Sequence, residues 1–384
     1  MGSTRPSIGD GTLTSVQRSR KRGSDGVVTG HLFKIVRERL PCTQRKLAEL
    51  LNVDLTTIQG WESGRRSLAG LSSAQFMKLR RQLLRQGADA ALLVLLDAAM
   101  EADSVIAHTL GEEGAADEIQ THPLYGWVFT RTATHMIAWA LTGVAPTALP
   151  RAPATTPPRR GPTPASPILP ASERKRFFDR LRQCAEVAGR AGPEGALLRR
   201  QALYLCSHDE APDTHAWLAD MQGRKPAKLT HSVWTPAWSD ARSLATSLTR
   251  YGDQDMLRAF IERGLGNDSG EIANLNYWAY WLGLDSLPQP DDSFMANRSP
   301  RLWDAGVLLR ALADRLAPDL ACVDLNIHSV WALIASRPCL LTTVPGLSQD
   351  LRQRVERLLD SGMVSQQSRR ELDAVHYGLR LSYP

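Results

Sequence analysis

A proline-rich segment near the middle of the chain restricts the fold more than any other feature. Residues 144–172 hold nine prolines in 29 positions and no acidic residue, and Ala, Thr and Ser fill most of the remainder. This composition supplies few side chains for a core and favours extended polyproline conformations. We therefore predict a linker at 144–172 that separates two helical parts of the chain.

Helical periodicity marks both parts. In 173–384, apolar residues recur every three or four positions, as in Phe177, Leu181 and Cys184, behind an expected N-cap at Ser172. Strict alternation of apolar and polar residues, which would indicate strands, is almost absent. The sequence predicts an all-α fold, with an all-α regulatory or partner-binding domain at 173–384. Its later helices are expected at 194–206, 239–251, 253–263, 270–282, 301–316, 326–336, 348–361 and 366–380.

Two apolar stretches ahead of the linker predict further helices. Residues 88–110 place Leu92, Leu96 and Ala99 on a wide apolar face, and an aromatic stretch follows at 124–142. The second stretch carries Arg131 and His135 and is too short to span a bilayer. We predict a helical extension at 86–143 and no membrane partner. Because wide apolar faces need covering, these two helices are also the predicted homodimer interface.

Charge is distributed unevenly along the chain. Residues 1–85 carry 16 Lys and Arg against 6 Asp and Glu, whereas the other 299 residues carry 30 against 34. A polyanionic partner is therefore expected at the N-terminal quarter. Residues 1–26 are polar and predict a disordered basic arm. Its cations are Arg18, Arg20, Lys21 and Arg22.

Cysteine usage and the absence of catalytic motifs exclude several classes of protein. The five cysteines are widely spaced without a Cys-x-x-Cys pair, which favours a reducing cytoplasm. The N-terminus lacks the apolar core of a signal peptide. Arginine far exceeds the seven lysines, which indicates a GC-rich bacterial genome. No phosphate-binding glycine loop, nucleophile motif or paired-carboxylate signature occurs, so we do not expect an enzyme.

One short cluster has the residue types of a metal site. Cys206, His208, Glu210 and His215 lie within ten residues, but their spacing matches no structural or catalytic zinc site. A surface loop that collects polar residues is the simpler interpretation. We therefore expect neither a metal nor another cofactor.

Residues 43–66, TQRKLAELLNVDLTTIQGWESGRR, predict two short helices joined by a sharp turn. Thr43 is a suitable N-cap for the first helix, and Asn52 tolerates the left-handed conformation that a tight turn requires. Asp54 is a suitable N-cap for the second helix, in which Ile58 and Trp61 face inward at i, i+3 spacing. This is the helix-turn-helix pattern, and we place its domain at 27–85.

The same segment resembles the lambda-repressor-like Cro/C1-type (XRE family) helix-turn-helix. Eleven residues match the pattern of that family at the correct spacing: Thr43, Gln44, Leu47, Ala48, Val53, Thr57, Ile58, Trp61, Glu62, Gly64 and Arg66. Asn52 stands where glycine is commonest. The resemblance covers about residues 30–85 and implies a second helix, 54–63, that enters the major groove of double-stranded DNA.

This resemblance assigns expected roles to individual residues. Those expected to face base edges are Leu55, Thr56, Gln59 and Gly60. Those expected to contact phosphates are Thr43, Gln44, Arg45, Arg65 and Arg66. The basic arm would add phosphate or minor-groove contacts.

Each role has a structural alternative. Thr43 and Gln44 also suit a helix cap, and the arm also suits a solubilising tail. Glu62 is expected to be a structural partner of a nearby arginine or backbone amide. In the C-terminal part, Tyr277, Trp278 and Trp281 lie in the densest aromatic segment, which predicts either a buried core helix or a ligand pocket.

The sequence favours a sequence-specific DNA-binding transcriptional regulator, more readily a repressor than an activator. It would be a cytoplasmic, nucleoid-associated homodimer that reads two half-sites. Its C-terminal domain would bind a small-molecule, peptide or protein effector. The alternative is a DNA-binding maintenance or architectural protein of a plasmid, phage or chromosome that recruits a partner through this domain.

Overall fold

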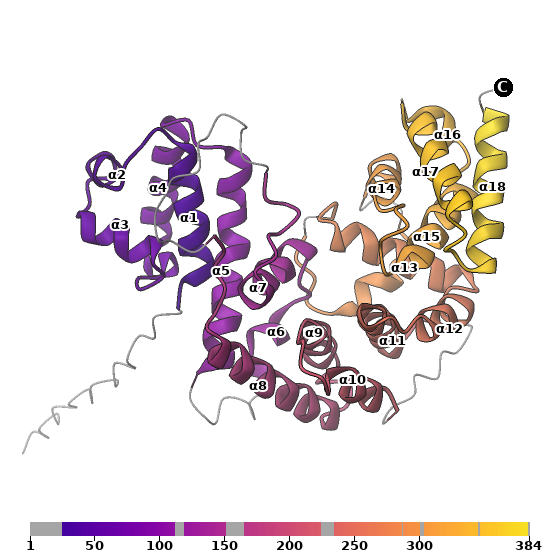
Figure 1. The fold of residues 1–384 in the computed structure, drawn as a ribbon, viewed down its shortest axis with the longest axis horizontal. Coiled ribbons are helices and arrows are strands. Elements are labelled where there is room, and N and C mark those ends of the chain that lie inside the picture. Colours follow the sequence, from indigo (N-terminus) through magenta and orange to yellow (C-terminus); the bar gives the residue numbers. More distant parts are fainter. Residues whose placement is uncertain are drawn as a thin grey trace, which may run out of the picture.

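A computed structural model describes residues 25–111, 119–150, 165–223, 234–285, 287–299, 303–344 and 346–382. Every regular element within these ranges is a helix, which confirms the all-α prediction. The helices form two lobes, an N-terminal lobe of α1–α10 and a C-terminal lobe of α11–α18 (Figure 1). None of the helices in the described ranges has the length and hydropathy needed to cross a membrane.

The first half of the N-terminal lobe is built around one long helix, α5. The elements here are α1 (Val27–Arg39), α2 (Gln44–Leu51), α3 (Leu55–Glu62), η1 (Leu68–Gly70), α4 (Ser73–Arg85) and α5 (Ala90–Leu110). Asp89 caps α5 by accepting the N–H of Ala91. Leu92, Leu96 and Ala99 are fully buried, and α5 packs against α1, α7 and α8. The helix expected at 88–110 is confirmed.

The second half contains a break that the sequence did not predict. Its elements are η2 (Ile119–Thr121), α6 (Pro123–Gly126), α7 (Arg131–Thr142), α8 (Ala171–Arg190), α9 (Ala196–Cys206) and α10 (Thr214–Gly223). The single helix expected at 124–142 is therefore wrong. The chain is extended at Trp127, the Val128 N–H donates to the Gln289 carbonyl at 2.8 Å, and Thr130 caps α7.

The C-terminal lobe follows the predicted helices closely. Its elements are α11 (Pro236–Leu248), η3 (Thr249–Tyr251), α12 (Asp255–Gly264), α13 (Asp268–Trp281), η4 (Asp292–Ala296), α14 (Ala305–Ala313), α15 (Val323–Ser336), α16 (Leu340–Thr343), α17 (Leu347–Ser361) and α18 (Gln366–Ser382). All residues of α13 from Ala273 onward are buried, so this helix lies at the centre of the lobe.

The core continues across the proline-rich segment. Residues 151–164 lie outside the described residues, but Leu169 is 2% exposed and its N–H donates to the Ala140 carbonyl at 2.9 Å. Helix α8 then begins at Ala171 with Pro170 at the N-cap, so the N-cap expected at Ser172 is wrong. One hydrophobic cluster extends from Val28 through α8 and α9 to Leu248. The described ends of the segment are therefore packed against the N-terminal lobe.

The apolar faces that suggested a homodimer interface are covered by the chain itself. Leu93 and Leu95 of α5 and Ile137 of α7 are buried, whereas Val94 is a large apolar side chain of α5 that remains exposed. The reason for choosing α5 and α7 as the interface therefore does not hold, because these faces need no second copy to cover them. Dimerisation itself stays a prediction.

Candidate nucleic-acid interface

Helix α2 begins and ends as its residue types require. The Thr43 hydroxyl accepts the N–H of Lys46 at 3.2 Å and caps the helix. Leu47 and Ala48 are buried beneath it. Asn52 ends the helix with φ = 52°, the left-handed conformation that asparagine tolerates better than most residues. The cap at Thr43 and the left-handed Asn52 were predicted from the sequence.

Helix α3 buries its apolar face against α1. Ile58 is fully buried, and the Trp61 ring packs edge-on against Phe33 at 5.7 Å between centroids. Asp54 occupies the N-cap position, but its side chain makes no capping hydrogen bond. On the facing side, Gly30 lies so close to α3 that a Cβ there would stand 2.3 Å from the Trp61 carbonyl oxygen. Glycine at this position therefore sets the depth at which α3 packs.

A polar network at the base of α3 fixes its orientation relative to α2. The Arg37 guanidinium of α1 donates two hydrogen bonds to the Glu62 carboxylate, one of them at 3.0 Å. The Gln44 side-chain amide donates to the same carboxylate at 2.7 Å. Burial alone would lower the pKa of Arg37, but the hydrogen bonds and charge of Glu62 raise it. Glu62 thus has the structural partner expected for it.

The outer face of α3 carries the side chains expected to face DNA, with one exception. Thr56 is exposed, and Leu55 and Gln59 are half-buried. Gly60 is buried because the stem of Arg66 lies over it, and a Cβ at Gly60 would stand 3.0 Å from Arg66 Cδ. The stem of Arg66 therefore covers Gly60 in the structure, and the role expected of Gly60 at base edges stays a prediction.

Arg66 occupies the face that Gly60 leaves free. Its Nη1 donates to the Thr57 hydroxyl of α3 at 2.9 Å, which holds the guanidinium along the helix. The side chain is otherwise exposed. Sequence reasoning placed Arg66 beyond the helix end with a phosphate role. The combination of a glycine in α3 and an arginine six residues later was the signal that could have revealed this contact.

Exposed cations surround α2 and α3. Arg45 and Lys46 lie in the first turn of α2, and Arg65 follows α3 with its Nε donating to Ser63 at 3.0 Å. The first turn of α2 contains no acidic residue. Helix N-termini attract anions through their free N–H groups and their dipole. The basic arm residues Arg18, Arg20, Lys21 and Arg22 lie outside the described residues.

The aromatic segment of α13 is a core element whose rings contact arginines. Tyr277, Trp278 and Trp281 are each less than 10% exposed. The Arg242 guanidinium lies 3.8 Å from the Tyr277 ring centroid and 4.9 Å from that of Trp278. Tyr277 and Trp281 stack at 5.9 Å. These rings are therefore packed as in a buried core helix, which was one of the two alternatives for this segment. A ligand pocket formed by them stays a prediction.

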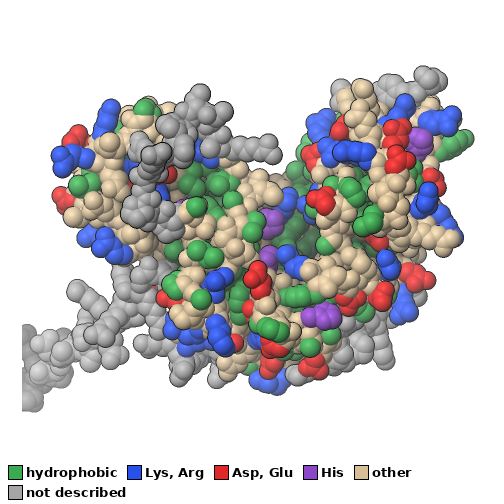
Figure 2. Space-filling model, viewed as in Figure 1, with side chains coloured by type: hydrophobic (Ala, Val, Ile, Leu, Met, Phe, Trp, Pro, Cys, Tyr) green, Lys and Arg blue, Asp and Glu red, His purple; other side chains and the backbone are tan. Residues whose placement is uncertain are grey.

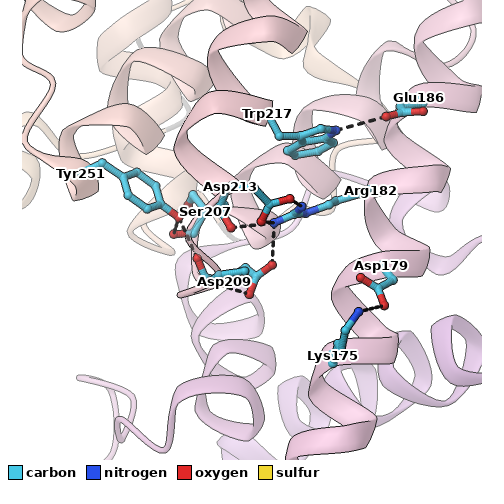
Figure 3. A network of polar contacts seen from close by, with 11 residues as sticks. Lys175, Asp179, Arg182, Glu186, Ser207, Asp209, Asp213, Trp217 and Tyr251 are labelled. Atoms are coloured by element: carbon cyan, nitrogen blue, oxygen red, sulfur yellow. Dashed lines mark hydrogen bonds and ion pairs between the residues drawn. The ribbon is translucent and has the colours of Figure 1, made fainter.

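The loop that was considered as a metal site is held by an arginine instead (Figure 3). Arg182 of α8 donates to Asp209 and Asp213 at 2.7 Å each and to Thr214 at 2.6 Å. Tyr251 donates to the Asp209 carbonyl at 2.9 Å. Within the described ranges, no group of three or more His, Cys, Asp and Glu is arranged to hold a metal ion. This network therefore anchors the loop between α9 and α10.

Comparison with known proteins finds no relative of the chain. No protein-family model, curated protein or solved structure matches the chain. The class that the structure defines is an all-α protein whose N-terminal lobe exposes one face of helix α3 among basic side chains.

Proposed function

We propose that the chain is a sequence-specific DNA-binding transcriptional regulator that inserts α3 into the major groove. The observation that carries the proposal is the division of α3 into two faces. Ile58 and Trp61 are buried, whereas Thr56 and Gln59 are accessible on the opposite side. A groove-reading helix needs short polar side chains on a free face and a rigid support behind it.

The surrounding cations would anchor the backbone of the duplex. Arg45, Lys46 and Arg65 are exposed at the ends of α2 and α3, where phosphates flank a bound helix. Gln44 can donate only one further amide hydrogen, because the other is bonded to Glu62. Its backbone N–H at the start of α2 is a second donor for the same phosphate.

Arg66 is the proposed reader at the position of Gly60. Because its stem lies over Gly60 and its guanidinium bonds to Thr57, it would approach the bases with α3. Arginine forms paired hydrogen bonds with guanine in the major groove. One such module contacts few base pairs, so a homodimer on two half-sites about 34 Å apart would supply the affinity. Repression is the simplest outcome of occupying a promoter.

Selection of bound sequences from random DNA tests the proposal on the full chain. A sequence should be enriched, and fluorescence anisotropy should show tight binding to it whose affinity falls steeply between about 50 and 200 mM salt. Arg65→Ala should reduce the slope of log affinity against log salt by about 0.9, the value expected for one phosphate contact. Arg310→Gln, an exposed change on α14, serves as the charge-matched control and should leave binding unchanged. Absence of binding to any DNA at about 50 mM salt would refute the proposal.

A further inference from the structure

Two hollows of this molecule differ in the charge of their linings. Figure 2 shows one between the lobes, with basic, histidine and hydrophobic side chains on its floor. The other is a pocket of about 520 Å³ within the N-terminal lobe, and its charged lining residues are two carboxylates of α5, Asp97 and Glu101. Among the described residues that line this pocket, none is Lys, Arg or His. The charge of the lining therefore favours a cation over an anion.

Three aromatic residues from separate parts of the lobe also line this pocket. Phe76 belongs to α4, and Trp127 and Phe129 lie in the break between α6 and α7. Trp127 is 36% exposed, and its ring packs edge-on against that of Phe129 at 6.4 Å between centroids. The faces of aromatic rings attract cations, and tryptophan does so most strongly. The rings and the carboxylates therefore favour the same kind of ligand.

One cation of the chain already uses a carboxylate and a ring of this pocket. The Arg80 guanidinium lies 5.6 Å from the Phe76 ring centroid and donates to Asp97 at 3.1 Å. Asp97 is therefore neutralised by a side chain of the protein itself. Arg80 also illustrates how this lining holds a positive charge, between a carboxylate and an aromatic ring.

Glu101 and Trp127 form a second pair of this kind. Residues four apart on a helix lie on the same side, so Glu101 is the neighbour of Asp97 along α5. Glu101 is half-buried, accepts a hydrogen bond from Trp127 and forms no ion pair with a described residue. Burial, followed by the charge of Asp97, raises the pKa of Glu101 to about 7. A cation beside Glu101 would lower this pKa again, because it favours the ionised carboxylate.

We propose that this pocket binds a small organic cation, an amine or quaternary ammonium compound with an apolar body, whose charge lies between Glu101 and the Trp127 ring. The half-buried carboxylate supplies the counter-charge, and the apolar and aromatic lining covers the body of the ligand. One cation is expected per pocket, because Arg80 already neutralises Asp97. A cavity of about 520 Å³ lies within the usual size range of small-molecule sites.

The pocket is close in sequence to the proposed DNA interface. Leu68 and Ala69 of η1 line it, and they follow Arg66 by two and three residues. A ligand would therefore bridge the segment that leaves α3 to α5. Any effect of the cation on DNA affinity rests on the proposed function, whereas binding of the cation does not. The sequence placed an effector in the C-terminal domain, and this pocket lies in the other lobe.

Calorimetric titration of the full chain without DNA tests the pocket separately from the proposed DNA interface. The probes are phenethylamine, phenethyl alcohol and phenylpropanoate, which share a phenyl ring on a short chain and differ in charge. At pH 8 and constant ionic strength, one amine should bind per chain, at least about tenfold more tightly than the alcohol. The phenylpropanoate should not bind, because its charge repels Glu101.

Proton release provides a second readout of the same binding event. At pH 7, titrations in buffers of different ionisation enthalpy should show that binding of phenethylamine releases part of a proton. The release is expected because the cation drives the partly protonated Glu101 to ionise. A cation that binds elsewhere, beside a carboxylate that is already ionised, would release none.

Three variants identify the site. Glu101→Gln should weaken phenethylamine binding at least about tenfold and abolish the proton release, while the affinity for the alcohol stays unchanged. Trp127→Ala should weaken binding of both the amine and the alcohol, because it removes apolar surface together with the ring face. Glu262→Gln, an exposed change on α12, is the matched control and should leave all affinities unchanged.

Three results would overturn the proposal. The first is the absence of phenethylamine binding below millimolar concentration in the folded wild-type chain. The second is equal affinity for the amine and the alcohol, which would show an apolar pocket that does not recognise charge. The third is an equal loss of affinity in Glu101→Gln and in Glu262→Gln, which would indicate general charge attraction. None of these measurements contains DNA, so they keep their meaning if the chain does not bind DNA.

Discussion

The carboxylate of Asp103 accepts a hydrogen bond from the backbone N–H of Val28 at 2.9 Å, across 75 residues of sequence. Its second oxygen accepts the N–H of Thr29 at the same distance. The N-cap residue of α1, Gly26, has no side chain to do this. Asp103 of α5 therefore caps α1 through a tertiary contact, and its negative charge lies at the positive end of that helix.

Asp103→Asn should destabilise the N-terminal lobe by about 2 kcal/mol, measured by urea denaturation at pH 8. The asparagine oxygen can accept only one of the two N–H groups, and its own amide would face the other. Asp97→Asn on the same helix is the control. Asp97 forms an exposed pair with Arg80, so its loss should cost less than about 1 kcal/mol. Equal losses in the two variants would contradict the capping role.

Glu62→Gln should cost about 3 kcal/mol, because it removes the buried counter-charge of Arg37 and leaves only the more exposed Glu38, 3.5 Å away. Removing both charges, with Arg37→Met and Glu62→Met together, should restore much of this stability. The double variant should nevertheless bind DNA weakly, because Gln44 loses the carboxylate that orients it. Denaturation and anisotropy titrations of the single and double variants separate the two effects. DNA affinity that recovers together with stability would show that the network has no orienting role.

Gly60→Ala should stabilise α3 by up to about 1 kcal/mol through helix propensity while it disturbs DNA recognition. The new Cβ would stand 3.0 Å from Arg66 Cδ, so the arginine stem must shift by a few tenths of an ångström, which disturbs its contact with Thr57. We expect a higher melting temperature together with weaker discrimination against altered sites. Arg66→Ala should produce the same loss of discrimination. Unchanged discrimination in either variant would remove Arg66 from the proposed reading face.

Glu101→Gln should change how stability depends on pH. Burial, followed by the charge of Asp97, raises the pKa of Glu101 from 4.5 to about 7, and a hydrogen bond from Trp127 opposes this. Between these values the unfolded chain has released the proton that the folded chain keeps, so the free energy of unfolding falls as pH rises. The variant should lack this fall. Urea denaturation of the wild-type chain and the variant at several pH values from 4.5 to 8 measures the difference between their free energies of unfolding. A difference that does not change with pH would contradict the prediction.

Helix positions were predictable where local residues determine them. Asp89, Thr43 and Asn52 begin or end helices through contacts within a few residues, and the expected segments at 88–110 and 43–66 contain helices as predicted. The periodicity of 270–282 likewise predicted α13. Helix propensity, capping and apolar spacing act over one or two turns, so a single sequence displays them directly.

Features that depend on distant partners were not predictable. The helix expected at 124–142 breaks because the N–H of Val128 bonds to Gln289 and that of Phe129 bonds to Gln201. The cover of Gly60 is an exception, because the arginine six residues later in the sequence could have indicated it.

The burial of Leu169 against α7 has a consequence for limited proteolysis of the proline-rich segment. Because one core includes residues from both sides of 151–164, a single cut there should yield two fragments that remain associated and elute together. Lengthening or shortening this connection should likewise leave the position of α8 on α5 unchanged. The described residues on the two sides of 151–164 belong to one core, so a peptide bond within 151–164 should be breakable without separating those parts.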